Sequence, residues 1–423
     1  MGTVQTVQPS GHQLQVSGYG LILFWWGVLG FSLMFSVLFW EPSVGAGLNL
    51  FDLVISLPAL AAVPLLFWRR GWLDSVTLRS IWPLLAYTLY ALASLSWAIE
   101  PNIPRSFRAG GQLLGLFLML SIFYRSGAEH YLKLTLSIGI HLATVFCFWH
   151  LLVMYGLLGV SIEQPLYTGA VESSFLAFGV DPINQMHATL LVAPMIAMQV
   201  ALYKRHQVWW VQGINLISIA VMVLFLLSLQ RRSGMLALLV LLFSALWLYR
   251  SRWLGALLTV CVVLFGLAIW LVPDVIFSRG TSWRPEIWMS TWDRIQGHWF
   301  FGHGLSNTEV PVPVFAPTGE LLQTFLHPHN LALTVWFFLG GAGLLLWCIL
   351  WVPGLFMRLR SREKAVQDDF FILPMLVGAS ILVFDGGEPM ALFHFDWFCF
   401  WLPVLLMLSS NMRPSAIDGV KVG

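Results

Sequence analysis

Charge is what this sequence has least of. Charged side chains make up 10% of the 423 residues, whereas soluble globular proteins carry about 25%. Hydrophobic residues reach 58%, above the about 45–50% of an ordinary domain. A chain with so few charges cannot cover a water-facing surface, so we exclude a cytosolic enzyme, a secreted domain and a disordered chain. The net charge of +2 gives no sign of nucleic-acid binding.

Cysteine is scarce as well. The four cysteines all lie in apolar runs and form no CxxC pair, which argues against a zinc site and against a disulfide framework. The first eighteen residues contain no Lys or Arg, so we expect no cleavable signal peptide. The GxxxxGK[ST] loop is missing too, so we expect no nucleotide site.

What the sequence does have is long apolar runs. A bilayer core takes roughly 20 such residues as a helix, and runs of about this length predict an all-α polytopic membrane protein with about 12 transmembrane helices. We divide the chain into residues 1–272 with nine helices, one large outward loop at 273–329, and residues 330–423 with three helices and a cytoplasmic tail. The predicted spans are 20–40, 50–68, 80–99, 109–124, 134–157, 187–203, 208–229, 233–249, 253–272, 330–357, 370–384 and 389–409.

The basic residues set the orientation through the positive-inside rule. With both termini in the cytoplasm, 15 of the 22 basic residues face inward, including every Lys. The seven that face outward resist the rule, and all are Arg, which binds phosphate oxygens as a fork where Lys offers only a point charge. They are Arg105, Arg108, Arg231, Arg232, Arg279, Arg284 and Arg294.

The outward loop is the expected place for chemistry, because it is far longer than the roughly 12–15 residues above which a loop needs a functional explanation. Residues 284–299 predict a helix that begins at Arg284, with Pro285 suited to its first turn. A free helix start favours an anion, so we expect Arg284 to bind phosphate; a salt bridge with Glu286 or a lipid head group is the alternative. The residues Trp288, Trp292, Ile295 and Trp299 form an apolar stripe that predicts an interfacial helix, and that helix could also be an anchor only.

Two histidines stand where the loop meets the next span. The motif His327-Pro-His329 precedes an apolar run, so His329 is expected at the mouth of a helix near the membrane surface. A neutral imidazole is a suitable general base for a hydroxyl. His327 is equally suitable by chemistry alone, and either ring could instead be a satisfied hydrogen-bonding group.

The remaining outward polar residues are open to two interpretations. An arginine pair at a hairpin tip, Arg231 and Arg232, should be paired or functional because it costs insertion energy, and the alternative is interaction with lipid head groups. Arg105 and Arg108 carry the same ambiguity. Asp385 and Glu388 form an outward turn; they could orient His329 or pair with the arginines, or the turn could simply be exposed.

Together these segments resemble the O-antigen ligase and polymerase superfamily of bacterial membrane glycosyltransferases. The likeness is carried by LSLQRRSGMLALL (227–239), TSWRPEIWMSTWDRIQGHWFFGHG (281–304) and HPHNLALTVWFFLGGAG (327–343), and weakly by DPINQMHA (181–188). These match the family's Ser/Arg hairpin, its R-x-x-[IL]-W segment with a Gly-x-Gly turn, and its His-Asn-x-x-Leu helix start. The motifs cover the C-terminal half, and the span count and large loop agree along the whole chain.

The resemblance implies a glycosyl transfer at the periplasmic face of the bacterial inner membrane. The donor would be a glycan on undecaprenyl diphosphate and the acceptor the lipid A core, with membrane lipids around the protein. Carried over by motif, Arg284 and Arg232 would hold the diphosphate, and His329 would be the base, although Arg231 and His327 stand beside the last two. Further substrate contacts are assigned to Arg231, Arg105, Arg108, Asp385, His327 and Trp288.

We expect this reaction to need no metal or other cofactor. The outward face has no cluster of Asp residues, and DxD is absent, while arginines can stabilise a leaving diphosphate by charge. An O-antigen polymerase or a protein O-oligosaccharyltransferase would use the same residues. A transporter or flippase is disfavoured, because ionisable groups gather at one face instead of within the spans.

Overall fold

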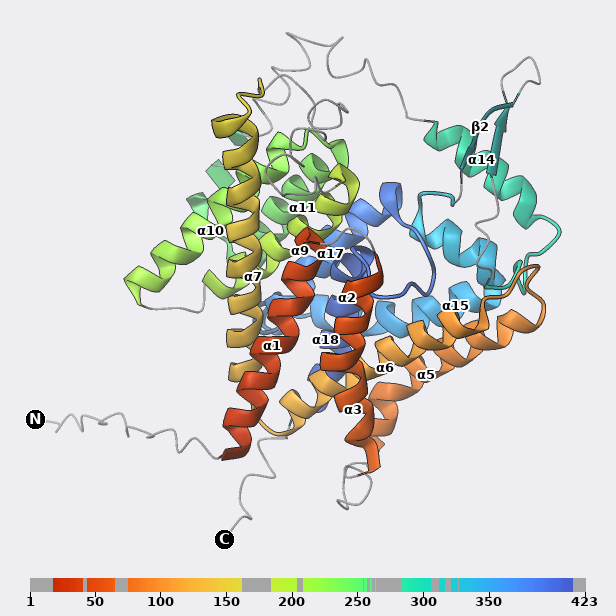
Figure 1. The fold of residues 1–423 in the computed structure, drawn as a ribbon, viewed down its shortest axis with the longest axis horizontal. Helices are drawn as coiled ribbons and strands as arrows, with labels where there is room; N and C mark the ends of the chain where they lie inside the picture. The colour runs from red at the N-terminus through yellow and green to blue at the C-terminus, as the bar shows by residue number, and fades with distance from the viewer. Residues whose placement is uncertain are drawn as a thin grey trace, which may run out of the picture.

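The structure is a computed structural model, and it describes residues 18–40, 44–64, 75–161, 184–203, 208–253, 255–256, 259–260, 263, 283–305, 312–315, 321–325 and 327–413. These residues form a helical bundle (Figure 1). Its first half contains α1 (Gly18–Trp40), α2 (Val44–Phe51), a π-helical turn (Asp52–Ser56), α3 (Leu57–Ala61), α5 (Ser75–Ala93), α6 (Ile103–Arg125), α7 (Glu129–Leu151) with a π-helical extension (Leu152–Leu157), and α9 (Gln185–Tyr203).

The second half contains the loop elements as well as helices. It comprises α10 (Trp209–Ser228), α11 (Arg232–Tyr249), α14 (Arg284–Ile295), the strands β1 (Val312–Phe315) and β2 (Leu321–Phe325), α15 (Leu331–Leu359), α16 (Arg362–Gln367), α17 (Asp369–Asp385), a π-helical turn (Trp397–Trp401) and α18 (Leu402–Ser410). The strands pair antiparallel, Val312 with Phe325 and Phe315 with Leu321. This hairpin corrects the expectation of helices alone in the loop.

Six of the described helices are long and apolar enough to cross a membrane: α6, α7 with its extension, α9, α10, α11 and α15. Shorter apolar helices lie at Gly20–Phe35, Leu48–Ala61 and Trp397–Ser410. The chain is therefore an integral membrane protein by length and composition of its helices. Most of the predicted span at 253–272 lies outside the described residues, so the total of twelve spans stays a prediction.

The helix α10 has the inside-out polarity of a lipid-facing helix. It buries Asn215 and Ser218, which are 1% and 2% exposed, and leaves Leu216, Ile217 and Leu224 on the outside. In water this arrangement would be unfavourable, but in lipid the apolar side chains need no burial and the polar ones do.

The arrangement of the helices places α9, α17 and α18 in the centre of the bundle. The helix α17 packs against α9 and α11, and α18 packs against α6. On the outside, α1 lies along α7 and α5 packs on α15, while α14 contacts β1 and α15 at one corner of the molecule (Figure 1). The loop helix is thus docked on the bundle and not held away from it.

A break in α15 is what docks the loop. Gly340 has φ +65° and ψ −172°, which no other residue of this helix adopts, and the segment after α14 inserts its backbone there. Gly302 and Gly340 touch backbone to backbone, so a Cβ on either one would overlap the other segment. Four hydrogen bonds close the splice: His303 N–H to Phe337 O (3.0 Å), Gly304 N–H to Phe338 O (2.8 Å), Gly341 N–H to Trp299 O (2.6 Å) and Ala342 N–H to Phe300 O (3.1 Å).

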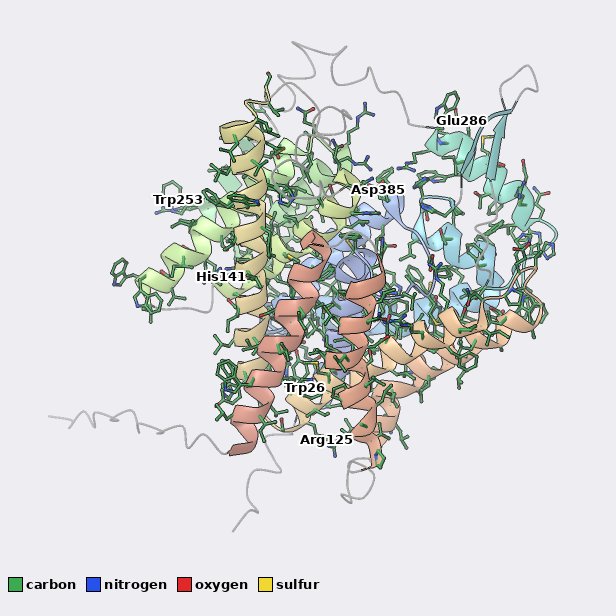
Figure 2. All side chains as sticks on the ribbon, in the orientation of Figure 1. Trp26, Arg125, His141, Trp253, Glu286 and Asp385 are labelled. Carbon is green, nitrogen blue, oxygen red and sulfur yellow. The ribbon has the colours of Figure 1, made fainter. Side chains whose placement is uncertain are left out.

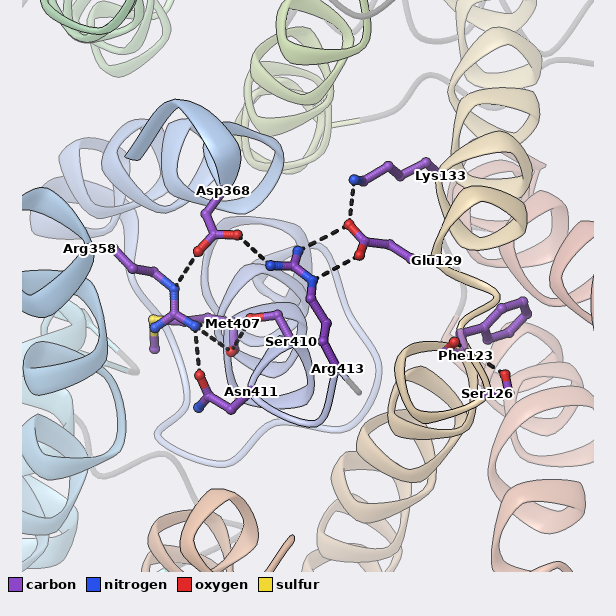
Figure 3. Close-up of polar contacts among 10 residues, drawn as sticks. All are labelled: Phe123, Ser126, Glu129, Lys133, Arg358, Asp368, Met407, Ser410, Asn411 and Arg413. Carbon is purple, nitrogen blue, oxygen red and sulfur yellow. Dashed lines mark hydrogen bonds and ion pairs between the residues drawn. The ribbon is translucent and has the colours of Figure 1, made fainter. Parts of the chain in front are cut away.

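Charged clusters occupy opposite ends of α15 and α17. At one end Arg358 and Asp368 pair at 2.9 Å, and Arg413 joins Asp368 (2.9 Å) to Glu129 (2.8 Å), as Figure 3 shows. At the other end of the same two helices lie the start of α15 and Asp385, the last residue of α17. Figure 2 likewise places Asp385 and Arg125 at opposite ends of the bundle.

Candidate functional site

Asp385 is the centre of the site. Its Oδ1 accepts a hydrogen bond from Nη2 of Arg231 at 3.0 Å and from Nη2 of Arg284 at 2.9 Å. The carboxylate is buried, with 2% of its side chain exposed, while the two arginines keep 28% and 17%. One buried carboxylate therefore holds two guanidinium groups together, with both still reachable from outside.

Each of these residues stands at the end of a helix. Arg231 is the residue before α11, and the hairpin turns at Gln230, whose φ is +52°. Arg284 is the first residue of α14, with proline in its first turn as predicted. Asp385 ends α17. Because an arginine at a helix start faces the positive end of the dipole, the carboxylate between these two starts compensates both.

The two histidines lie beside this ion-pair group, in the turn that leads into α15. The backbone N–H of His329 donates to Nδ1 of His327 at 3.3 Å, and the ring centroids are 4.1 Å apart. His329 has φ +55°. Residues other than glycine rarely adopt this backbone conformation, and it is often found at functional positions. Asn330 caps the helix by accepting from the N–H of Leu333 at 3.0 Å.

The charge environment keeps both imidazoles neutral. Burial first, then His327, Arg284 and Arg231, lowers the pKa of His329 to about 2. Burial and Arg284 also lower the pKa of His327, against the opposing effect of Asp385. Both rings are therefore close enough to the arginines to feel their positive charge. Each ring is a weak proton acceptor unless a negatively charged group binds nearby.

The turn that follows Asp385 packs against the start of α15. A Cβ on Gly386 would lie 2.6 Å from Cβ of Leu331, so only glycine fits this close approach. The contact connects the carboxylate to the histidine turn without any flexible side chain between them.

The other predicted site residues divide into two groups. Arg105 pairs with Glu388, which lies in the turn that follows Asp385, so Arg105 is near the site. Arg108 instead pairs with Asp52 at 2.6 Å on a different part of the bundle. Arg232 is exposed at the first position of α11 and is one residue away from the arginine that contacts Asp385.

Trp288 is half-buried and stacks on Phe384 with centroids 6.1 Å apart, next to Asp385. Of the predicted apolar stripe, only Ile295 is buried within the protein, and the contact of its tryptophans with the membrane interface stays a prediction. The side chains that α14 buries are Ile287, Thr291 and Ile295, and the helix ends at Ile295. The outer tryptophans instead meet Trp336 of α15, since Trp292 and Trp299 lie 5.3 and 5.4 Å from its ring.

Three residues near the site were missed by the sequence analysis. His187 and His394 have ring centroids 4.9 Å apart, and the carboxylate of Asp396 reaches the backbone of Gly387 in the Asp385 turn. The signal available in the sequence was that His394 and Asp396 interrupt an otherwise apolar run, where ionisable residues are expensive and usually functional. Among the described residues, no group of three or more His, Cys, Asp or Glu is arranged to hold a metal ion.

Fold and site together define an integral membrane protein of many helices, with paired arginines and two histidines at one end of the bundle. Residues 217–348 match the family model described as O-Antigen ligase, a range that includes Arg231, Arg284 and both histidines. An O-antigen ligase of Pseudomonas aeruginosa (strain PAO1) is 30% identical over 161 residues, which is 36% of this chain and 37% of that protein. The aligned part thus spans little more than a third of the curated relative. Both comparisons therefore relate part of the chain, including the arginines and histidines of the site, to O-antigen ligases.

Proposed function

We propose that this protein transfers a glycan from undecaprenyl diphosphate to a sugar hydroxyl of the lipid A core. The observation that carries the proposal is the Asp385 carboxylate that joins Arg231 to Arg284 beside the His327–His329 pair. The partial similarity to O-antigen ligases supports it from the side of sequence. In this proposal the Asp385 end faces the periplasm of the bacterial inner membrane, both termini are cytoplasmic, and membrane lipids surround the bundle.

The arginines would act on the leaving group. A diphosphate leaves as an anion and needs no proton, so charge stabilisation at its oxygens is the main requirement. We assign this task to Arg231 and Arg284, in place of Arg232, because these two guanidinium groups converge on one carboxylate. Donor phosphate oxygens would bind the exposed side of both arginines, while Asp385 holds them from the buried side.

The histidine turn would act on the acceptor. The acceptor hydroxyl oxygen attacks the anomeric carbon as the bond from that carbon to the phosphate oxygen breaks. The hydroxyl proton passes to an imidazole nitrogen of His329, the bonding electrons leave with the diphosphate, and the anomeric configuration inverts. A base at this place contributes typically 10²–10⁴-fold to the rate.

Donor binding would also activate the base. The pKa of free His329 is low partly because Arg284 and Arg231 are close to it. Burial is the largest cause of that low pKa, and a diphosphate between the arginines would cancel their positive charge and so raise the pKa of His329, which makes the ring a stronger base. The proton acceptor would then become strong only when the donor is in place.

Reconstituted transfer tests the proposal. The purified protein in lipid vesicles is given undecaprenyl-diphosphate-linked glycan and lipid A core, and the product is followed on a gel. We expect His329→Ala to lose at least about 10²-fold of the rate, whereas His298→Ala, on the exposed part of the loop, keeps it. Full activity in EDTA is expected for a reaction without metal. An undiminished rate for His329→Ala would contradict the assigned base.

A deletion strain distinguishes the acceptors. If the acceptor is the lipid A core, the strain should lose all long lipopolysaccharide bands and accumulate polymer on the carrier lipid. A core that still bears one repeat unit would instead indicate that the acceptor is a growing glycan.

A further inference from the structure

A second polar group adjoins the turn that carries Asp385. It consists of Arg105, His187, Glu388 and His394, which we call the His394 cluster. Arg105 and Glu388 form an ion pair whose side chains are 41% and 37% exposed. The His394 and His187 rings meet edge to face with centroids 4.9 Å apart, and His187 stacks on Phe395 at 4.4 Å.

Four separate elements bring this cluster together. Arg105 lies in the first turn of α6, where its N–H donates to the capping Asn102 at 3.0 Å, and His187 lies in the first turn of α9. Glu388 follows α17, and His394 precedes the π-helical turn. Convergence of four chain segments on one accessible spot is unusual for side chains whose only task is solvation.

The backbone around the cluster is held rigidly. The hydroxyl of the buried Tyr87 donates to the carbonyl of Pro389 at 2.7 Å. The N–H of Phe393 donates to the side-chain oxygen of Gln112 at 2.7 Å, also in a buried place. The residues on both sides of the cluster are therefore fixed by the core, as a binding site requires.

The cluster adjoins the site of the proposed reaction. Glu388 is three residues after Asp385 in one turn, and Gly386 between them touches the start of α15. Burial, then His187, Arg105 and His327, lowers the pKa of His394 to about 3, so its ring is neutral. The ion pair with Glu388 joins Arg105 to the turn that carries Asp385.

The geometry of transfer requires a separate place for the acceptor. In an inverting displacement, the acceptor oxygen approaches the anomeric carbon from the side opposite to the leaving diphosphate. If the arginines on Asp385 hold the diphosphate, the acceptor must bind at another part of the site, and the His394 cluster is a polar group joined to the same turn through Glu388.

We propose that the His394 cluster binds the hydroxyl groups of the acceptor sugar. This inference rests on the proposed function. Neutral imidazoles and a charge-balanced Arg–Glu pair offer donors and acceptors without net charge, which suits a neutral polyol and disfavours a phosphate. The cluster therefore determines acceptor recognition, and the paired arginines on Asp385 determine donor recognition.

Steady-state kinetics with both substrates varied separates the two roles. In the reconstituted assay, we expect His394→Gln and Glu388→Gln each to raise the KM for lipid A core about tenfold or more. The KM for the undecaprenyl-diphosphate-linked glycan should stay unchanged, which also reports that each variant is folded. Controls of the same kind on the outward loop, His298→Gln and Arg294→Gln, should leave both KM values unchanged.

The outcomes distinguish this inference from the proposed function. An unchanged KM for the acceptor in both variants, or a KM rise for the donor alone, would overturn the inference. If the wild-type protein forms no product at all, the proposed function fails. If the wild type is active and His329→Ala is inactive, but both cluster variants behave as wild type, only the inference fails.

Discussion

At the scale of single residues, the decisive arrangement is one carboxylate with two arginines. Two guanidinium groups repel each other, and Asp385 brings them together at 3.0 and 2.9 Å. A diphosphate carries more negative charge than this carboxylate, and Arg binds it through two parallel N–H groups where Lys would use one. The forked geometry of the side chains should therefore matter as much as their charge.

Replacement of Arg284 by Lys tests that point. The charge remains, but the fork is lost, so we expect the turnover rate to fall about 10²-fold, as when one donor to a developing anion is removed. The matched control is Arg294→Lys, near the other end of the same helix α14, which should retain the wild-type rate. Equal rates for Arg284→Lys and wild type would show that only charge is used.

The pH dependence should differ between the free protein and its donor complex. Because the pKa of His329 is about 2 in the free protein, its neutral form persists far below pH 6, and kcat/KM should show no acid loss from this residue above about pH 5. Bound diphosphate raises that pKa, so kcat should fall as pH drops through the new value. Parallel acid limbs in the two profiles would contradict the coupling.

The depressed pKa also has a consequence for stability. An imidazole that prefers its neutral form in the folded protein stabilises the fold above the unfolded pKa of about 6.5, and this contribution is lost as pH falls below that value. His329→Gln should remove this part of the acid sensitivity, which thermal unfolding at pH 5 and pH 8 can measure.

Several of these residues could be recognised from sequence, and others could not. Arg284 at a helix start and the pairing of Asp385 with arginines follow from rules about helix ends and membrane charges, and the structure agrees with both. Whether Arg231 or Arg232 reaches Asp385 depends on where the turn before α11 ends, and a shift by one residue would exchange them. That turn is at Gln230, whose φ is +52°. His187 and His394 are far apart in the chain, and no local pattern brings them together.

At the scale of elements, the splice between the loop and α15 fixes Arg284 relative to His329. The loop backbone fills hydrogen-bonding positions that the break at Gly340 leaves in the helix. Sequence patterns could locate α14 and α15, since each begins with clear signals, but the break depends on contact between residues about forty apart in the chain. The β1–β2 hairpin is local, since it pairs Val312 with Phe325, but it was not predicted.

An added methyl group at the splice should disrupt the site from a distance. Gly302 has φ +69° and no room for a Cβ, whereas a Cβ on Gly297 would meet nothing within 4 Å. We expect Gly302→Ala to lose about 1–3 kcal/mol of stability through strain and most of the transfer activity, and Gly297→Ala to retain both. Comparable thermal unfolding and activity for the two variants would show that the splice does not position the site.

At the scale of the whole molecule, two charged ends define the bundle. The network of Figure 3 connects α7, α15, Asp368 between α16 and α17, and the residues after α18 through Arg358 and Arg413. Nη2 of Arg358 also donates to Asn411 at 2.7 Å and to Ser410 at 3.0 Å. The positive-inside rule predicts that the basic residues of this end and of the Asp385 end face opposite sides of the membrane. In the structure they lie at opposite ends of α15 and α17, and the membrane orientation stays a prediction.

Removal of one member of this network should loosen the bundle without touching the site. Arg358→Met leaves Asp368 and several buried acceptors without this donor, and such a loss typically costs about 3–5 kcal/mol. The exposed Arg360→Met, two residues further on, should have little effect. Thermal unfolding in detergent measures both, and an unchanged transition for Arg358→Met would mean that the network contributes no stability.

The break at Gly340 divides α15 into nine residues before it, Leu331–Leu339, and nineteen residues after it, Gly341–Leu359. At 1.5 Å per residue the longer part measures about 28 Å, close to the roughly 30 Å of a hydrocarbon layer. The shorter part is then not needed to cross the hydrocarbon layer, and it can extend about 14 Å beyond that layer into the region of the lipid head groups. Under the proposed function, a saccharide of any length could extend from there into water while its prenyl tail stays in the hydrocarbon layer, and the reacting bond would lie at the membrane surface.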